Sequence, residues 1–222
     1  MITRPEPGLT ASCKAARELG LNPVAAPLFT VEPVDWDIGQ DFDSVLIGSA
    51  NVLRHGGENL ALLKEAPVYA VGKTTAEAAR AAGLNVAFTG SDGLESCVDA
   101  LVSDGYSKPL RLTGRTHTAL KPRPGLSVQT IICYEAQNQL LCDEAERALK
   151  SPCVIMAYSA AAVETFEDEM ARLGLTASPH ILLTISQRAA DSATAKWHSV
   201  HIAERPDDAA MLAQAQILCQ RD

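Results

Sequence analysis

The feature of this sequence that most constrains its fold is a repeated alternation of short apolar runs with amphipathic stretches. Apolar runs such as VYAVG and HILLTIS have the length and composition of buried strands, and a helix-forming stretch follows each of them. Such alternation is typical of a largely parallel β-sheet with helices on its faces. The chain has 222 residues, 47% of them hydrophobic, which is enough for one large domain or two small ones.

The alternation recurs along the chain, which predicts two similar lobes. The pattern of residues 45–85 is echoed by residues 154–199. Extended stretches at 29–34 and 128–139, and the irregular stretch 36–42, interrupt the series and are candidate boundaries. The predicted helices span residues 8–19, 50–55, 75–82, 94–102, 143–150, 160–173, 189–195 and 209–219, and the predicted strands span 22–28, 44–49, 68–72, 85–90, 109–114, 127–135, 153–159, 180–186 and 197–203.

The charge balance is acidic, with 19 lysines and arginines against 27 aspartates and glutamates and a net charge of −8. Phosphate neutralisation dominates binding to nucleic acid, so a nucleic-acid partner is not expected. No apolar run approaches the roughly 20 residues of a membrane span, and the N-terminal MITRPEPG lacks the apolar core of a secretory signal. We therefore expect a cytoplasmic protein without a membrane partner, in which local groups hold any anionic ligand.

The cysteines favour free thiols in a reducing compartment. They are scattered singly, with no C-x-x-C pair and no histidine at metal-ligand spacing: Cys13, Cys97, Cys133, Cys142, Cys153 and Cys219. A zinc site or a disulfide framework is the alternative, and no metal site is expected.

Small polar or glycine-rich turns follow several predicted strands and open the next helices. These turns are Gly48–Asn51, Gly72–Thr75, Gly114–Thr118, Tyr158–Ala160 and Ser186–Arg188. Each presents backbone N–H groups at the positive end of a helix dipole, which suits a carboxylate or a phosphate. Any one turn is most simply a helix cap. Several turns at equivalent positions of two lobes predict a polyanion site at the carboxyl ends of the strands.

Few residues stand out as catalytic, and the usual nucleotide and hydrolase motifs G-x-G-x-x-G, G-x-x-x-x-G-K-[ST] and G-x-S-x-G are missing. Tyr134 is the best polar candidate, because a phenol can donate, accept and lose a proton; packing between strands is the competing interpretation. Arg4, Arg115 and Arg188 follow strands or lie in turns and could clamp carboxylates. A surface salt bridge for Arg4, and solvation for the other two, are the alternatives.

Several segments carry a resemblance to a known family. They are ITRPEPG, LGLNPVAAPLFTVEPV, LIGSANVLRHGG, VYAVGKTTAEAARAAGLNVAFTG, ICYEA, VIMAYSAAAVETF and TISQRAADSATAKWHSVHIAERPDDAAML. In order and spacing the chain resembles a bacterial uroporphyrinogen-III synthase over nearly its whole length. Residues 92–124 match least well.

The resemblance implies an α/β protein of two flavodoxin-like lobes with parallel sheets, joined by two extended connecting strands. Lobe one is expected at 1–34 and 140–222, and lobe two at 35–139. The family cyclises hydroxymethylbilane to uroporphyrinogen III, with inversion of ring D and loss of water, and uses no metal or organic cofactor. We expect a monomer that contacts hydroxymethylbilane synthase transiently.

The resemblance also implies roles for single residues. Tyr134 matches the tyrosine proposed to assist loss of the hydroxyl group, Ser49, Thr75 and Ser159 match cleft positions, and Gly72 and Ser186 match backbone-donor turns. With Arg4, Asn51, Arg115 and Arg188 from the turns above, these form the expected substrate-binding set. Arg188 and Ala189 replace two threonines of some members, so no hydroxyl contact is expected there. A non-catalytic two-lobed binding or regulatory protein for an anionic small molecule is the alternative.

Overall fold

Two parallel sheets organise the chain in a computed structural model that describes residues 1–38, 41–91 and 93–220. Unit 1 comprises Met1–Thr30 with Asn138–Asp222, and unit 2 comprises Val31–Gln137. The strands β1 (Phe29–Pro33) and β6 (Gln129–Asn138) pass from one unit to the other. This arrangement confirms the predicted α/β class with parallel sheets and two connecting strands. The predicted lobe boundaries, after residues 34 and 139, stay predictions.

Unit 1 is built on a short sheet with strand order β7-β8-β9, all parallel. Ile2 bridges both Ala25 and Met156 in parallel, which extends the sheet by two short segments. The resulting order is the 2-1-3-4-5 order of flavodoxin-like sheets. The elements of unit 1 are α1 (Gly8–Glu18), α5 (Asp143–Ala148), β7 (Val154–Ala157), α6 (Ala160–Arg172), β8 (Ile181–Thr184), α7 (Gln187–Ala190), β9 (Ser199–Ile202) and α8 (Asp208–Cys219).

Unit 2 holds most of a six-stranded sheet with the order β1-β6-β5-β2-β3-β4. Its five strands β2 to β6 are parallel, so their carboxyl ends meet at one edge. Between them they follow a doubly wound 3-2-1-4-5 order. The elements are β2 (Ser44–Ile47), α2 (Asn51–His55), the 3₁₀-helix η1 (Glu58–Leu63), β3 (Pro67–Val71), α3 (Lys73–Ala81), β4 (Asn85–Gly90), α4 (Leu94–Ser103) and β5 (Pro109–Gly114).

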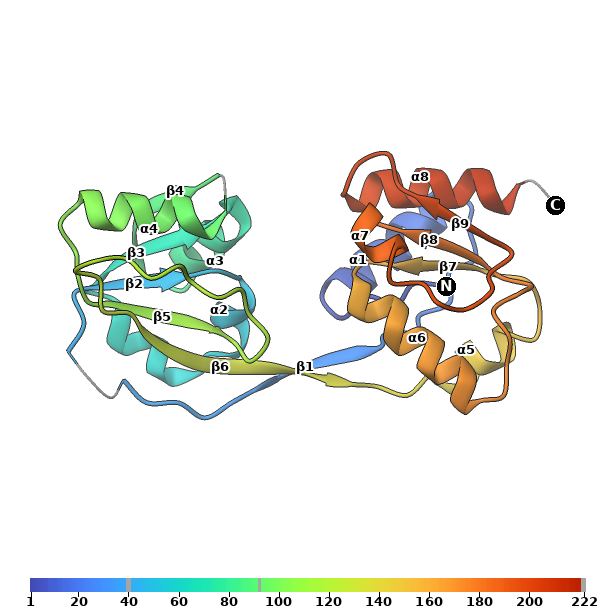
Figure 1. Cartoon of the computed structure of the whole chain (residues 1–222), viewed down its shortest axis with the longest axis horizontal. Coiled ribbons are helices and arrows are strands. Elements are labelled where there is room, and N and C mark those ends of the chain that lie inside the picture. The colour runs from blue at the N-terminus through green and yellow to red at the C-terminus, as the bar shows by residue number, and fades with distance from the viewer. Residues whose placement is uncertain (39–40, 92, 221–222) are drawn as a thin grey trace. The chain divides into compact units, whose positions relative to one another are not determined.

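The apolar strands are explained by helices on both faces of each sheet (Figure 1). In unit 1, Ile155 and Leu182 pack with α5 and α6, whereas the alternate residues Met156 and Leu183 pack with α1 and α8. Residues that alternate along a strand point to opposite faces, so a doubly covered strand must be apolar throughout.

Unit 2 is covered less evenly. Helices α2 and α3 and the η1 turn cover one face, and α4 covers the β2 and β3 part of the other, where Leu46 and Tyr69 lie. The crossover 115–128 between β5 and β6 contains no helix, as Pro122 and Pro124 predict, and runs as an irregular tube (Figure 1). Its Leu120 joins the α4 cluster, so an irregular segment takes the place of a helix here.

Two predicted elements are wrong. Within the described chain, residues 22–28 form a single bridge, at Ala25, and three backbone hydrogen bonds to Ile2 and Thr3, because their partner is this short segment. In place of the predicted helix 189–195 there is the single turn α7, Gln187–Ala190. The Ser192 hydroxyl donates to the carbonyls of Ala160 and Ala189 just beyond it, and such side-chain bonds to the backbone compete with helix formation. Gly39 and Gln40, inside the predicted boundary 36–42, lie outside the described residues.

Two further expectations concern thiols and the membrane. No disulfide joins cysteines in the described part of the chain, and Cys13, Cys97 and Cys133 are buried, as expected of small apolar side chains. None of the described helices is both long and apolar enough to cross a bilayer.

Candidate functional site

The strand orders point to one edge of each sheet. In open α/β sheets, ligands bind outside the carboxyl ends of the strands, where the strand order reverses. In unit 2 the reversal lies between β2 and β5, and in unit 1 it lies between the Ile2 segment and β7. The predicted residues fall at these edges in two groups. Unit 2 carries Ser49, Asn51, Gly72, Thr75, Arg115 and Tyr134, and unit 1 carries Arg4, Ser159, Ser186 and Arg188.

Ser49 and Asn51 follow β2 directly. The Ser49 hydroxyl accepts the Asn51 N–H at 3.2 Å, so this serine closes the turn that opens α2. Arg54 donates to the Asn51 side-chain oxygen at 2.7 Å. Both side chains are half-buried and keep hydrogen-bonding capacity toward the strand ends.

Gly72 makes the break between β3 and α3. Its φ of 79° and ψ of 155° suit glycine alone, and the helix starts at Lys73, two residues before the predicted start at Thr75. Thr75 is therefore the third helical residue and is 5% exposed, which corrects its expected place in an open turn. Because Gly72 has no side chain, α3 begins without a side-chain cap, and its first N–H groups face the sheet edge.

Tyr134 reaches the same edge from β6. It pairs in register with Gly114, the last residue of β5, and its ring lies 6.2 Å from the His55 ring, centroid to centroid. Among the described residues, none bonds the Tyr134 hydroxyl. Burial lowers the pKa of His55, and the Arg54 charge lowers it further against the opposing effect of Glu32. An imidazole whose neutral form is favoured by burial thus lies beside the phenol, and sequence spacing does not reveal this neighbour.

Arg115 begins the crossover that follows β5. Its guanidinium pairs with Glu135 on β6. The backbone N–H of Arg115 donates to the Tyr134 carbonyl at 3.0 Å. Arg115 lowers the pKa of Glu135, with a smaller effect from Gln137. The Arg115 side chain is 62% exposed, so its ion pair is weak and a ligand carboxylate can compete for it.

The serines of unit 1 are helix caps. The Ser159 hydroxyl accepts the Ala162 N–H at 3.1 Å at the start of α6, and the Ser186 hydroxyl accepts the Ala189 N–H at 3.4 Å at the start of α7. Each hydroxyl proton remains able to donate to a ligand. Arg188 lies in α7, is exposed, and forms no ion pair within the described ranges.

Arg4 belongs to a network rather than to an open site. It pairs with Asp208 at 3.2 Å and stacks over the Tyr158 ring at 4.6 Å. Tyr158 and Ser12 both donate to the same carboxylate, at 2.6 and 2.8 Å. Burial, then the bond to Asp208, raises the pKa of Tyr158. Arg4 therefore forms a salt bridge, which was the alternative to its expected role in binding an anion.

Sequence reasoning missed Arg111, which lies within β5. It is 5% exposed and donates to the Thr118 carbonyl at 2.7 Å. The sequence feature that could have revealed it is a single arginine inside the apolar run PLRLTG. A single charged side chain in a buried strand normally needs a compensating group, which is either another side chain of the protein or a bound ligand.

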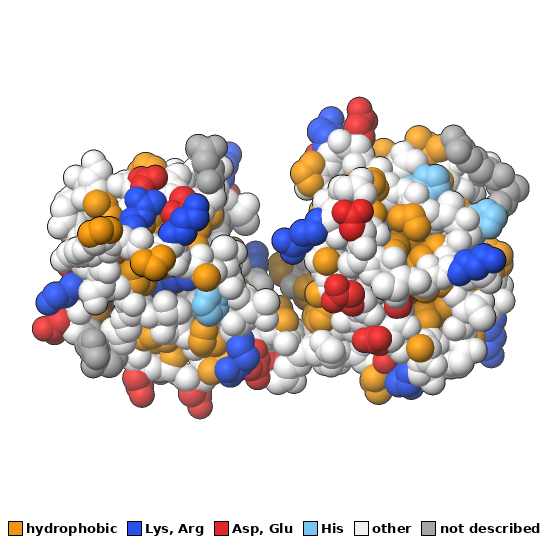
Figure 2. All heavy atoms as spheres, viewed as in Figure 1, with side chains coloured by type: hydrophobic (Ala, Val, Ile, Leu, Met, Phe, Trp, Pro, Cys, Tyr) orange, Lys and Arg blue, Asp and Glu red, His pale blue; other side chains and the backbone are white. Residues whose placement is uncertain are grey.

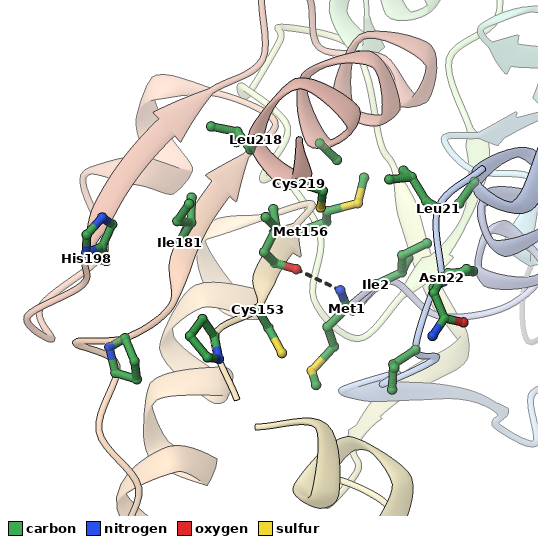
Figure 3. Close-up of a pocket in the computed structure, with 17 residues that line it drawn as sticks. Met1, Ile2, Leu21, Asn22, Cys153, Met156, Ile181, His198, Leu218 and Cys219 are labelled. Atoms are coloured by element: carbon green, nitrogen blue, oxygen red, sulfur yellow. Dashed lines mark hydrogen bonds between the residues drawn. The ribbon is translucent and has the colours of Figure 1, made fainter. Parts of the chain in front are cut away.

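A cavity of about 610 Å³ lies at the opposite, amino edge of the unit 1 sheet (Figure 3). Val154 and Ile181, the first residues of β7 and β8, line it together with Met1, whose nitrogen donates to the Val154 carbonyl at 2.7 Å. His198 and Cys219 also face it. No Asp, Glu, Lys or Arg lines this cavity, and the Met1 amino group that does line it donates to the Val154 carbonyl and has its pKa lowered by burial.

Charges of both signs are interspersed on the one face of the molecule that Figure 2 draws. On this face, acidic and basic side chains alternate on each unit and form no continuous basic patch. Within the described residues, no group of three or more His, Cys, Asp or Glu could hold a metal ion.

The family model described as uroporphyrinogen-III synthase HemD matches residues 11–213. The chain belongs to the uroporphyrinogen-III synthase family. Accordingly it is a cyclising lyase of the uroporphyrinogen-III synthase type, which acts in tetrapyrrole and heme biosynthesis on a small-molecule substrate. No curated protein sequence matches it.

Solved synthases of this family share the fold. The uroporphyrinogen-III synthetase of Helicobacter pylori 26695 is 15% identical, with a TM-score of 0.61 over 89% of this chain and 95% of that one. A mutant synthase of the extremely thermophilic bacterium Thermus thermophilus is 22% identical, with a TM-score of 0.50 over 100% of both chains. At such low identities the likeness shows the two-unit α/β fold and leaves the roles of single residues to this chain's own geometry.

Proposed function

We propose that this enzyme binds hydroxymethylbilane at the carboxyl ends of its strands and that Tyr134 assists the loss of water. The observation that carries the proposal is the position of Tyr134 at the edge where β2, β3 and β5 end, in register with Gly114. The same edge presents the uncapped N-terminus of α3. A proton donor and an anion cradle thus share one edge of unit 2.

In the first step, the hydroxymethyl C–O bond of ring A breaks as the pyrrole nitrogen supplies its electron pair. The Tyr134 phenol gives its proton to the departing oxygen, so water leaves, and a cationic azafulvenium and the Tyr134 phenolate remain. The His55 ring lies 6.2 Å from the phenol ring, and burial lowers the pKa of His55.

In the second step, the substituted carbon of ring D attacks the azafulvenium and gives a spiro intermediate. This intermediate fragments and recloses with ring D reversed, and the proton released on re-aromatisation restores the phenol. The protein's main contribution is to hold the two chain ends in contact, since orientation alone accelerates such closures strongly.

The substrate is a polycarboxylate and the protein has a net charge of −8, so local donors must hold it. The α3 N–H groups behind Gly72 and the Ser159 hydroxyl at the start of α6 supply such donors. Arg115 and Arg188 supply exposed cations beside them. Ser49, Asn51 and Ser186 complete the proposed binding set, whereas the buried Thr75 and the paired Arg4 support it from behind.

The cellular setting follows from the substrate. Hydroxymethylbilane cyclises spontaneously to the type I isomer, so rapid transfer from hydroxymethylbilane synthase favours the type III product. We therefore propose a cytoplasmic monomer that contacts that synthase transiently and needs no metal or organic cofactor.

Isomer analysis of the product tests this function. Purified protein supplied with hydroxymethylbilane should yield uroporphyrinogen III in place of the type I isomer that forms in buffer alone. Type I product at the buffer rate, with tight binding of the bilane, would instead support the non-catalytic binding or regulatory alternative.

A further inference from the structure

Arg111 is the one buried cationic side chain among the lysines and arginines that the structure describes, with an exposed fraction of 5%. It lies on β5 in a row across the sheet that runs Tyr69, Leu46, Arg111, Thr130. Tyr69 and Leu46 in this row are buried under α4. Arg111 therefore points to the same face, where the crossover 115–128 takes the place of a helix.

No described carboxylate forms an ion pair with Arg111. Its only described hydrogen bond is the one to the Thr118 carbonyl, at 2.7 Å. A guanidinium has five N–H donors, so most of them have no hydrogen-bond partner among the described residues. Burial lowers the pKa of Arg111, and no neighbouring charge opposes that effect.

Two other charged groups, the buried Glu169 and the partly exposed Arg123, are paired. Glu169, the one buried acid of the described chain, receives two N–H bonds from Arg172 at 2.9 Å each and a third from the Leu141 backbone. Arg123, on the same crossover that covers Arg111, pairs with Glu95 and Asp99 of α4. A buried charge without a partner is costly, so Arg111 stands out against both.

The guanidinium lies near the strand-end edge. Its partner Thr118 is four residues beyond Gly114, the end of β5 and the register partner of Tyr134. Residues 115–119 are all exposed, so the segment whose Thr118 carbonyl accepts the Arg111 hydrogen bond lies at the surface.

We propose that Arg111 binds a carboxylate of the substrate beneath the first residues of the β5–β6 crossover. The inference rests on the proposed function, because the carboxylate is taken to be one of those on the tetrapyrrole. A planar guanidinium can hold a carboxylate through two parallel N–H bonds, which supplies both the missing counter-charge and a fixed orientation. The bond to the Thr118 carbonyl keeps the side chain in place until the anion arrives.

Two measurements on Arg111→Met test the proposal together. The affinity for uroporphyrinogen III, measured by anaerobic calorimetry, should fall by about 10- to 100-fold, the range for a hydrogen bond to a charged group. Arg111→Lys should lie between the wild type and Arg111→Met, because it keeps the charge and loses the paired geometry. Arg80→Met, which removes an exposed arginine of the same unit, is the matched control and should change affinity by less than about 3-fold.

Urea unfolding without ligand supplies the second measurement. Arg111→Met should unfold at the same urea concentration as the wild type or a higher one, because it removes an uncompensated buried charge. Equal affinities for the wild type and Arg111→Met, or no binding by the wild type, would overturn the proposal. So would weaker binding by Arg111→Met that accompanies a clear loss of stability, since Arg111 would then only hold the crossover. Isomer analysis of the wild-type product reports separately on the proposed function.

Discussion

The Tyr134 ring occupies the space that a side chain at position 114 would need. A Cβ added to Gly114 would lie 2.5 Å from the Tyr134 Cε2 atom and 2.6 Å from its Cζ atom. Gly114 has no positive φ, so its lack of a side chain serves the tyrosine rather than the backbone. The last residue of β5 thus fixes the position of the proposed proton donor on β6.

Tyr134→Phe should lower the rate of uroporphyrinogen III formation by about 100-fold or less. General acid assistance is worth about 10²–10⁴-fold, and the pyrrole nitrogen already drives loss of water, so the low end applies. The free energy of unfolding should stay unchanged, because the ring and its packing remain. Tyr106→Phe in the same unit is the control, and an unaltered rate for Tyr134→Phe would remove the phenol from the acid role.

Gly114→Ala should reproduce much of that loss by displacing the ring. Overpacking of this kind costs about 1–3 kcal/mol of stability, which urea unfolding will show. If the two changes act through the same phenol, the double variant that combines Gly114→Ala with Tyr134→Phe should be little slower than Tyr134→Phe alone. Full activity of Gly114→Ala, with its expected loss of stability, would show that the position of the ring is not critical.

Gly72→Ala should destabilise the protein by about 1–3 kcal/mol, because its φ of 79° and ψ of 155° lie in a region that only glycine adopts freely. An added Cβ meets no atom within 4 Å, so the cost is in the backbone alone. Affinity for uroporphyrinogen III should fall as the α3 N-terminus shifts. Gly48→Ala is the matched control: it also finds open space, has no positive φ, and should change stability by less than about 0.5 kcal/mol.

The stability of unit 1 should fall in mild acid because of His180. The residue is 1% exposed, its Nδ1 atom has no partner, and burial lowers its pKa from the ordinary 6.5. As pH falls below 6.5, the unfolded chain binds a proton that the folded protein excludes, so the free energy of unfolding decreases. The decrease ends once the pH passes below the folded pKa.

Comparison of wild type with His180→Gln by urea unfolding at pH 7.5 and pH 5 isolates this effect, because acidic residues contribute equally to both. The variant should lose less stability than the wild type between these two pH values. Equal losses would show that His180 is not excluded from protonation in the folded state.

Elements with strong local signals were predicted well. The helix predicted at 160–173 is α6, Ala160–Arg172, with Ser159 as its cap and Gly174 just beyond its end. The helix predicted at 94–102 is α4, Leu94–Ser103. In both, an apolar stripe and a terminal signal lie within the helix itself, so no distant contact is needed to specify them.

Elements that depend on distant partners were missed. Residues 22–28 look like a strand, yet their pairing with the short segment at Ile2 and Thr3 amounts to three backbone hydrogen bonds and the Ala25 bridge. The proximity of His55 to Tyr134 joins segments 79 residues apart (134 − 55 = 79), and no local pattern reports it. Arg111 had a signal, a charge in a buried strand, but its lack of an acidic partner appears only once the sheet is assembled.

Amide chemical shifts of ¹⁵N-labelled protein, titrated anaerobically with uroporphyrinogen III, locate the bound tetrapyrrole directly. The largest changes should fall at the carboxyl ends of the strands, at Gly72, Arg115 and Tyr134 in unit 2 and at Ser159 and Ser186 in unit 1. Changes concentrated instead at the amino edge of the unit 1 sheet, around the cavity lined by Val154, Ile181 and His198, would contradict the strand-end site.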